Sequence, residues 1–172
     1  MVAQLLIDYL KRSKAEYQVL KHSIAFTAQE TAECSHIHGH NFAKVVMVKI
    51  DGELSMVVLP AHYTLDLEIL RDVLGVGSVR LASEHEFKHR FPRCETGAMP
   101  PFGHLYGLMT YMVPVFAEGE MIAFNSGTHT EVIAMPYREY LRLAHVMEIE
   151  DGMMPSSMNS AMIHRRQPRF RY

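Results

Sequence analysis

The feature that most constrains the fold of this sequence is a pair of apolar runs separated by Asp51-Gly52. The runs, residues 42–50 and 54–59, are rich in valine, isoleucine, leucine and methionine. Asp-Gly between two such runs is a strong signal for a β-hairpin, because glycine accepts the positive φ that a tight turn requires. We therefore predict two antiparallel strands here, and the rest of the fold must be built around them.

Helices are predicted on both sides of this hairpin. Thr27 with Glu30, and Ser83 with Glu86, form capping boxes that start helices. Pro136 occupies what we take as the first position of a last helix, where its missing amide costs nothing. Apolar spacing and these start signals predict helices over residues 3–13, 27–36, 65–74, 83–90 and 137–145.

The remaining apolar runs are short and separated by glycine and proline, which is typical of strands in series. They lie at residues 17–20, 78–81, 105–108, 111–116, 121–124 and 131–135. The order is not the strict strand-helix repetition of a doubly wound fold. We therefore predict an α+β fold with a curved, mixed and mostly antiparallel sheet and flanking helices.

Composition predicts one folded domain with a short extension. A chain of 172 residues, 48% of them hydrophobic, can bury a single sizeable core. We assign the domain to residues 1–150. Residues 151–172 are rich in methionine and arginine and lack periodicity, so we predict a flexible tail there.

Charge, cysteine content and apolar runs indicate the compartment. No apolar run is long enough to span a membrane, and Asp8 interrupts the N-terminal apolar stretch too early for a signal peptide. Cys34 and Cys94 lie far apart and outside any metal-binding spacing, so we expect reduced thiols. These features predict a cytoplasmic protein without a membrane partner.

Three segments place permissive backbone or one isolated charge next to an apolar strand. Lys44 lies near the start of the first hairpin strand, within an otherwise apolar stretch. Residues 97–103 and 124–133 contain glycines, and the first of these segments also has two prolines. Main-chain amides in such segments can approach a ligand closely, because no Cβ stands in the way. A pocket at these three segments is the functional prediction.

Taken in this order, the three segments resemble the YbaK/ProX-type aminoacyl-tRNA deacylases, which are editing domains that hydrolyse mischarged tRNA. The Ala-Lys-Val context of Lys44 resembles that of the family's functional lysine, which helps to bind and orient the charged tRNA end. Gly97 to Pro101 matches the family's Gly-x-x-x-Pro loop, and Phe102-Gly103 extends the match. The resemblance implies a barrel-like sheet with flanking helices.

The resemblance also implies the site residues. Lys44, Gly97 and Pro101 carry the catalytic assignments. Backbone dipoles of the loop would polarise the ester carbonyl, and the family is described as using the terminal tRNA hydroxyl rather than a side-chain base. His129 is therefore interpreted first as a hydrogen-bonding wall of the pocket. The residues expected to contact substrate are Ala98, Met99, Pro100, Phe102, Gly103, Asn125, Gly127, Thr128 and His129.

No cofactor or metal is expected. His36, His38 and His40 alternate, and zinc accepts three imidazoles. However, Gly39 lies within this segment and no acidic residue or cysteine completes a known motif. We interpret the three histidines as a polar turn that caps a helix or lines the pocket mouth beside Lys44.

The implied partner is the 3′ end of aminoacyl-tRNA, with a synthetase as a further candidate, and no DNA partner is expected. Residues 151–172 carry +3, so residues 1–150 carry −5, and RNA contacts must be local. Candidate contacts are Lys44, Lys49, the tail and the group formed by Arg80, Lys88, Arg90 and Arg93. The alternative is a non-catalytic module that binds an aminoacyl or nucleotide-like ligand for regulation. The sequence does not specify the edited amino acid or the oligomeric state.

Overall fold

The computed structural model describes residues 4–24, 27, 30–31, 40–113, 116, 120–149 and 153–155. Its helices are α1 (Gln4–Arg12), α3 (Leu67–Leu74), α4 (Glu84–Phe87) and α5 (Tyr137–Ala144), with 3₁₀ helices η1 (Lys88–Arg90) and η2 (Gly103–Tyr106). Its strands are β1 (Gln18–Lys21), β2 (Phe42–Ile50), β3 (Glu53–Pro60), β4 (Tyr63–Leu65), β5 (Val79–Leu81), β6 (Met109–Met112), β7 (Met121–Thr128), β8 (Glu131–Pro136), β9 (Met147–Glu148) and β10 (Met153–Pro155). The predicted α+β class is confirmed.

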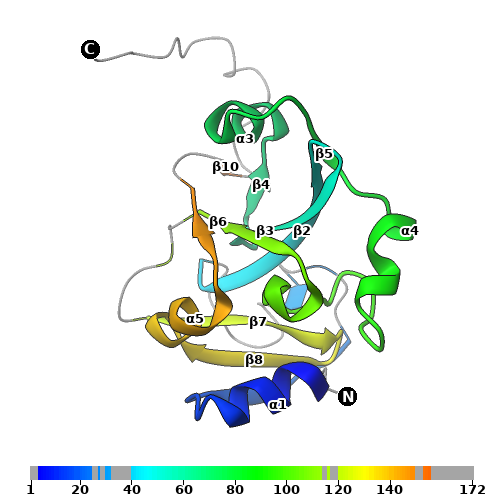
Figure 1. The fold of residues 1–172 in the computed structure, drawn as a ribbon. Coiled ribbons are helices and arrows are strands. Elements are labelled where there is room, and N and C mark those ends of the chain that lie inside the picture. Colours follow the sequence, from blue (N-terminus) through cyan, green and yellow to red (C-terminus); the bar gives the residue numbers. More distant parts are fainter. Residues whose placement is uncertain are drawn as a thin grey trace.

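Most of the described strands form one mixed sheet (Figure 1). Its order is β1-β8-β7-β2-β3-β6-β9, with β5 also pairing with β2. The predicted β2–β3 hairpin is antiparallel in the register Lys44↔Leu59 to Ile50↔Glu53, whereas the β2–β7 and β3–β6 pairs are parallel. β1 and β9 end the order without pairing to each other, so the sheet is open rather than a closed barrel.

The edge of β2 opposite β3 has two different neighbours. At the start of the strand, Phe42 and Ala43 pair with β7. At its end, residues 48–50 pair with β5. The two ends of β2 therefore lie in different surroundings, which matters because each end carries a lysine.

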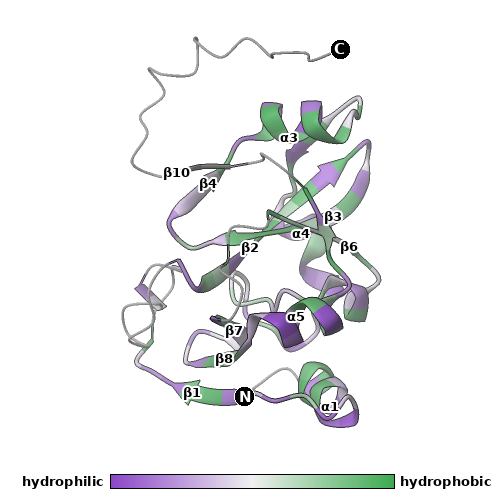
Figure 2. Ribbon diagram, turned by 90° about the vertical axis from the view of Figure 1, so that its left-hand side faces the viewer, coloured by the Kyte–Doolittle hydropathy of each residue, from purple (hydrophilic) through white to green (hydrophobic). Residues whose placement is uncertain are grey.

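Helices cover the sheet at separate places. In Figure 1, α1 and α5 lie beside β7 and β8, whereas α3 lies at the far end near β4 and β5. Apolar side chains on one face of each helix explain this packing: Leu6 and Leu10 of α1, and Tyr140 of α5, are fully buried. Figure 2 shows the complementary pattern, with hydrophobic stretches on β2 and β3 and hydrophilic residues on the exposed parts of α1 and α5.

The two predicted capping boxes are present in the structure. The Thr27–Glu30 capping box is present, with each backbone amide donating to the other residue's side chain at 3.1 Å. The predicted helix that follows lies mostly outside the described residues, as do Cys34, His36 and His38. α3 begins at Leu67 instead of residue 65, because the Asp66 carboxylate accepts from the amides of the first turn.

Four sequence-based assignments are wrong in detail. Residues 105–108 are not a strand, since Leu105 and Tyr106 belong to η2, and so short a run cannot by itself distinguish a strand from a helical turn. The strand predicted over 111–116 is β6, which begins at Met109 and ends at Met112. Residues 125–128, predicted as a loop, continue β7. Pro136 precedes α5 as its N-cap instead of opening it.

The predicted tail contains one unpredicted strand. β10 pairs antiparallel with β4 over three residue pairs, from Met153↔Leu65 to Pro155↔Tyr63. Residues 156–172 lie outside the described part of the chain, so their predicted flexibility is untested.

Candidate active site

Lys44 lies half-buried near the start of β2, next to the residues that pair with β7. Its ammonium donates a hydrogen bond to the Ala61 carbonyl oxygen at 3.1 Å. Burial lowers the pKa of Lys44 from 10.5, because desolvation penalises the charged form. Within the described residues it forms no ion pair with a carboxylate. No carboxylate that the structure describes therefore neutralises this positive charge.

Asn125 lies on the same face of the sheet as Lys44. Phe42 and Ala123 are register partners and both pack in one apolar cluster, so the residues two positions on, Lys44 and Asn125, point to that same face. Asn125 is 8% exposed, and its Oδ1 has no hydrogen-bond partner in the described residues. A buried carbonyl oxygen without a partner can accept a hydrogen bond from a ligand.

A hydrogen-bonded seam joins the turn at residues 95–98 to the end of β7. The Glu95 amide donates to the Gly127 carbonyl, and the Gly127 amide donates to the Ala98 carbonyl, both at 2.9 Å. The His129 amide donates to Glu95 Oε2 at 2.6 Å, and His129 Nε2 donates to the Thr96 carbonyl at 3.0 Å. Two of the three predicted segments are thus held together.

A β-bulge makes this seam possible. The pairing of β7 with β8 shifts register between Asn125 and Thr128, and Gly127 adopts φ 109° within the irregular stretch. Such a φ strongly favours glycine. The buried Ser126 side chain is bonded within the bulge, since its Oγ donates to the Glu131 carbonyl at 3.0 Å. This bonding explains why a glycine-containing polar stretch continues the strand instead of forming a loop.

The segment from Gly97 to Gly103 is anchored in the core by its second half. The Phe102 ring is fully buried and contacts Phe124 and Tyr140 edge-on, with ring centroids 5.5 and 5.4 Å away. The Tyr140 hydroxyl donates to the Pro101 carbonyl at 2.9 Å. A side chain at Gly103 would overlap Thr110 Oγ1. The loop is therefore a rigid platform, and Phe102 contributes packing.

Gly97 is the one residue of the 97–103 loop that is not buried. It is exposed and adopts φ 88°, while the next three residues are buried. The Ala98 amide is bonded to the Glu95 carbonyl and the Phe102 amide to the Pro100 carbonyl. Among the described residues, the Gly97 amide donates to the Met99 sulfur alone, at 3.2 Å, and a thioether is a weak acceptor. A ligand oxygen could replace that sulfur.

The histidine pair His40 and His62 lies close to Lys44. Their ring centroids are 3.9 Å apart, and His62 also contacts the Tyr63 ring. His62 directly follows Ala61, whose carbonyl binds Lys44. His62 was missed at the sequence level, because its neighbours 61–63 gave no motif. Among the described residues no group of three metal-binding side chains occurs.

Residues 22–143 match the aminoacyl-tRNA editing domain family. The chain belongs to this family. The resemblance inferred from Lys44, the Gly97 loop and the 124–133 segment is thereby confirmed. A search of curated proteins found no significant match.

Several solved structures share the fold of this editing domain. A hypothetical protein aligns with a TM-score of 0.75 and 16% identity, covering 87% of this chain and 99% of its own. A candidate trans-editing enzyme for prolyl-tRNA synthetase aligns with a TM-score of 0.73, 19% identity and coverage of 87% and 97%. A candidate signal-transduction protein from Marinobacter aquaeolei gives 0.68 and 18%, and the match spans 89% of this chain but 31% of that one. At these identities the likeness shows the fold alone.

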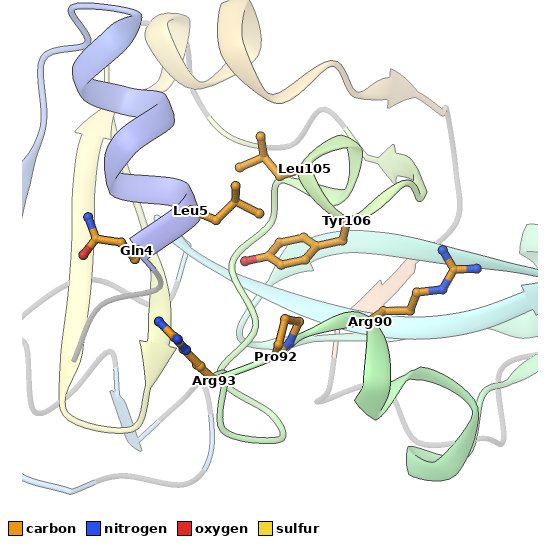
Figure 3. A pocket seen from close by; sticks show the side chains of 7 residues that line it. All are labelled: Gln4, Leu5, Arg90, Pro92, Arg93, Leu105 and Tyr106. Carbon is orange, nitrogen blue, oxygen red and sulfur yellow. The ribbon is translucent and has the colours of Figure 1, made fainter.

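The editing domain also has a cavity that its candidate site residues do not line. The cavity has a volume of about 550 Å³ and lies between the start of α1, residues 90–93 and η2 (Figure 3). It is lined by Gln4, Leu5, Arg90, Pro92, Arg93, Leu105 and Tyr106. No described helix is both long and apolar enough to cross a membrane.

Proposed function

We propose that this editing domain hydrolyses the ester bond of mischarged aminoacyl-tRNA in trans, acting on the 3′ end of the tRNA. The observation that carries the proposal is the seam between residues 95–98 and 127–129. This seam holds Gly97 beside β7, the strand that pairs with β2 next to Lys44. Family membership supports the same reaction class.

Lys44 would bind and orient the charged end of the tRNA. A phosphate of the terminal nucleotides is the natural partner for an ammonium that has no carboxylate beside it within the described residues. Partial burial strengthens such an interaction, because less water competes for the charge. The role needs the protonated form of the side chain.

The Gly97 amide would stabilise the charge that develops on the ester carbonyl. Its contact with the Met99 sulfur is weak, so a substrate oxygen can displace the sulfur at little cost. Pro101 would act indirectly by holding the loop, since its carbonyl is bound by the buried Tyr140 hydroxyl. Fixed dipoles of this kind favour the transition state over the ground state.

In the proposed reaction, the oxygen of a water molecule adds to the acyl carbon, and the bond between that carbon and the ribose oxygen breaks. One proton of the water ends on the ribose oxygen, so free amino acid and uncharged tRNA are released. The proposal assigns no side-chain base. Asn125, Gly127, Thr128 and His129 would form a wall of the pocket, and the Asn125 side-chain oxygen could accept from the amino group of the substrate.

The proposal is tested by incubating the protein with a panel of tRNAs, each charged with a non-cognate amino acid. We expect at least one to be deacylated far faster than it hydrolyses spontaneously. Binding of a non-hydrolysable aminoacyl-adenosine is measured in parallel. If the protein binds the analogue but hydrolyses no tRNA in the panel, the non-catalytic regulatory module is the correct interpretation. Cytoplasmic location and a synthetase partner remain predictions.

A further inference from the structure

The basic residues between positions 80 and 93 fall into two classes that the sequence does not distinguish. Arg80 is paired with Glu86 at 2.6 Å, and Lys88 with Glu84 at 3.4 Å. Arg90 and Arg93 form no hydrogen bond or ion pair with the part of the chain that the structure describes. Two of the four charges are therefore neutralised locally, and two remain available to an external anion.

The two unpaired arginines line the same cavity of about 550 Å³. In Figure 3 they lie on either side of the Tyr106 ring, with Leu5 above the ring and Pro92 below it. The remaining lining is mostly apolar, and Leu5 is 44% exposed. Burial raises the pKa of Tyr106, so its hydroxyl stays protonated and adds no negative charge to the cavity.

We propose that this cavity binds a nucleotide of the tRNA substrate outside the ester-hydrolysing site. A sugar–phosphate strand crossing the cavity would place phosphates near Arg90 and Arg93 and one nucleoside against the apolar surface. Charge favours RNA as the occupant. Residues 1–150 carry −5 overall, so a polyanion can bind only where unpaired cations lie close together, and Arg90 and Arg93 form such a group. The inference rests on the proposed function for the identity of the RNA.

The cavity is lined by residues from both flanks of the Gly97 loop. Arg90, Pro92 and Arg93 lie a few positions before the loop, and Leu105 and Tyr106 lie two and three positions after it. These two flanks are in contact, with the Phe91 and Tyr106 ring centroids 4.5 Å apart. A nucleotide bound between them would hold both ends of the loop, which links binding of the tRNA body to the geometry of the ester-polarising amide.

The first experiment measures binding of uncharged tRNA as a function of salt concentration. The Arg90→Ala/Arg93→Ala variant is expected to bind about tenfold more weakly, with a log–log salt slope lower by about 1.5, because two phosphate contacts are lost. The matched control is Arg80→Ala/Lys88→Ala, which removes the same charge from ion-paired positions. Its binding should change less than about twofold. Equal losses in both variants would overturn the inference in favour of a general field effect.

A second pair of variants tests the apolar surface. Leu5→Asp places a negative charge at the cavity, whereas Val73→Asp places one on α3, and the two side chains are 44% and 43% exposed. We expect Leu5→Asp alone to weaken tRNA binding severalfold, and circular dichroism reports whether either variant unfolds. Unchanged binding in Leu5→Asp and in Arg90→Ala/Arg93→Ala, with deacylation intact, would overturn the cavity site and leave the proposed function standing. If the two cavity variants lost tRNA binding but the wild-type protein deacylated no tRNA, the proposed function would be overturned and the cavity site would stand.

Discussion

The two ends of β2 each carry a lysine, and their surroundings differ. Lys49, beside β5, pairs with Glu86 at 3.5 Å, and the same carboxylate binds Arg80 and caps α4 through the Ser83 amide. Among the described residues, the ammonium of Lys44, beside β7, bonds to a carbonyl oxygen and to no carboxylate, and burial lowers its pKa. At the β5 end the lysine charge is thus paired with a carboxylate, whereas at the β7 end the lysine charge has no counter-charge in the described structure.

This difference shows how one strand can serve two purposes. Adjacent residues of a strand point to opposite faces, and Met47 and Val48 accordingly pack in different apolar clusters. Lys44 and Lys49, five positions apart, therefore lie on opposite faces. At the β5 end the network joins β2 to α4 and stabilises the fold. At the β7 end the Lys44 ammonium has no carboxylate partner among the described residues, and a lowered pKa such as that of Lys44 is typical of functional sites.

Removing each lysine in turn should produce the largest difference between the two ends of β2. Lys44→Ala is expected to lower the deacylation rate by about a thousandfold, because the substrate end loses its charged contact. Lys49→Ala should change the rate less than about twofold and affect mainly stability. Single-turnover deacylation of the preferred tRNA measures the first effect, and thermal melting shows whether both variants stay folded. Similar rate losses would show that the two ends act only through their summed charge.

A second variant pair tests the Gly97 loop next to the β7 end. Gly97→Ala adds a side chain at φ 88° within 3.6 Å of His129 Cε1, and we expect turnover to fall about a hundredfold as the amide is displaced. Gly52→Ala is the matched control, since Gly52 has φ 87° but open space around it in the hairpin turn. Binding of the aminoacyl-adenosine analogue should fall far less than turnover. Equal losses of binding and turnover would mean that the loop only shapes the pocket.

The pH dependence of deacylation should distinguish the two lysines further. Because burial lowers the pKa of Lys44, its ammonium is lost at a pH below the ordinary 10.5. The rate ratio of wild type to Lys44→Ala should therefore be highest at low pH and decline severalfold as the pH rises through the lowered pKa. Taking this ratio removes the intrinsic acceleration of ester hydrolysis by hydroxide. A flat ratio up to pH 10.5 would contradict a role for the charged form.

The lowered pKa of Lys44 also makes the folding stability rise with pH. The folded protein disfavours the Lys44 ammonium, so the penalty is full below the lowered pKa. This penalty decreases as the pH rises from the lowered pKa of the folded state toward the pKa of Lys44 in the unfolded state. Wild type should thus gain stability relative to Lys44→Met across that window.

The smallest expected effect concerns the C-terminal segment, which lies far from both lysines in sequence. Deleting residues 152–172 removes β10 and its pairing with β4, so we expect the melting temperature to fall by about 2–4 °C. Deleting residues 156–172 retains β10 and should leave melting unchanged. Both deletions remove the four arginines and should weaken tRNA binding and its salt dependence alike. If only the longer deletion weakened binding, the effect would come from β10.

The sequence alone predicted the elements that depend on neighbouring residues. Asp51-Gly52 between apolar runs and the Thr27–Glu30 and Ser83–Glu86 capping boxes all use contacts within a few positions, and all are present. The family was recognisable for a related reason. Gly97–Pro101 and the context of Lys44 are short patterns whose residue types are required by the backbone and the charge they supply.

Only the tertiary structure decided which of these residues act together. The seam that joins Glu95–Ala98 to Gly127–His129 spans about thirty positions of sequence, and such contacts leave no local pattern. The same holds for charge. Lys44, Lys49, Arg80 and Arg90 look alike along the chain, and they differ because Glu86 lies beside two of them and beside neither of the others. Residue type determines that a charge is present, whereas the packing of distant segments determines whether that charge is neutralised or free to bind.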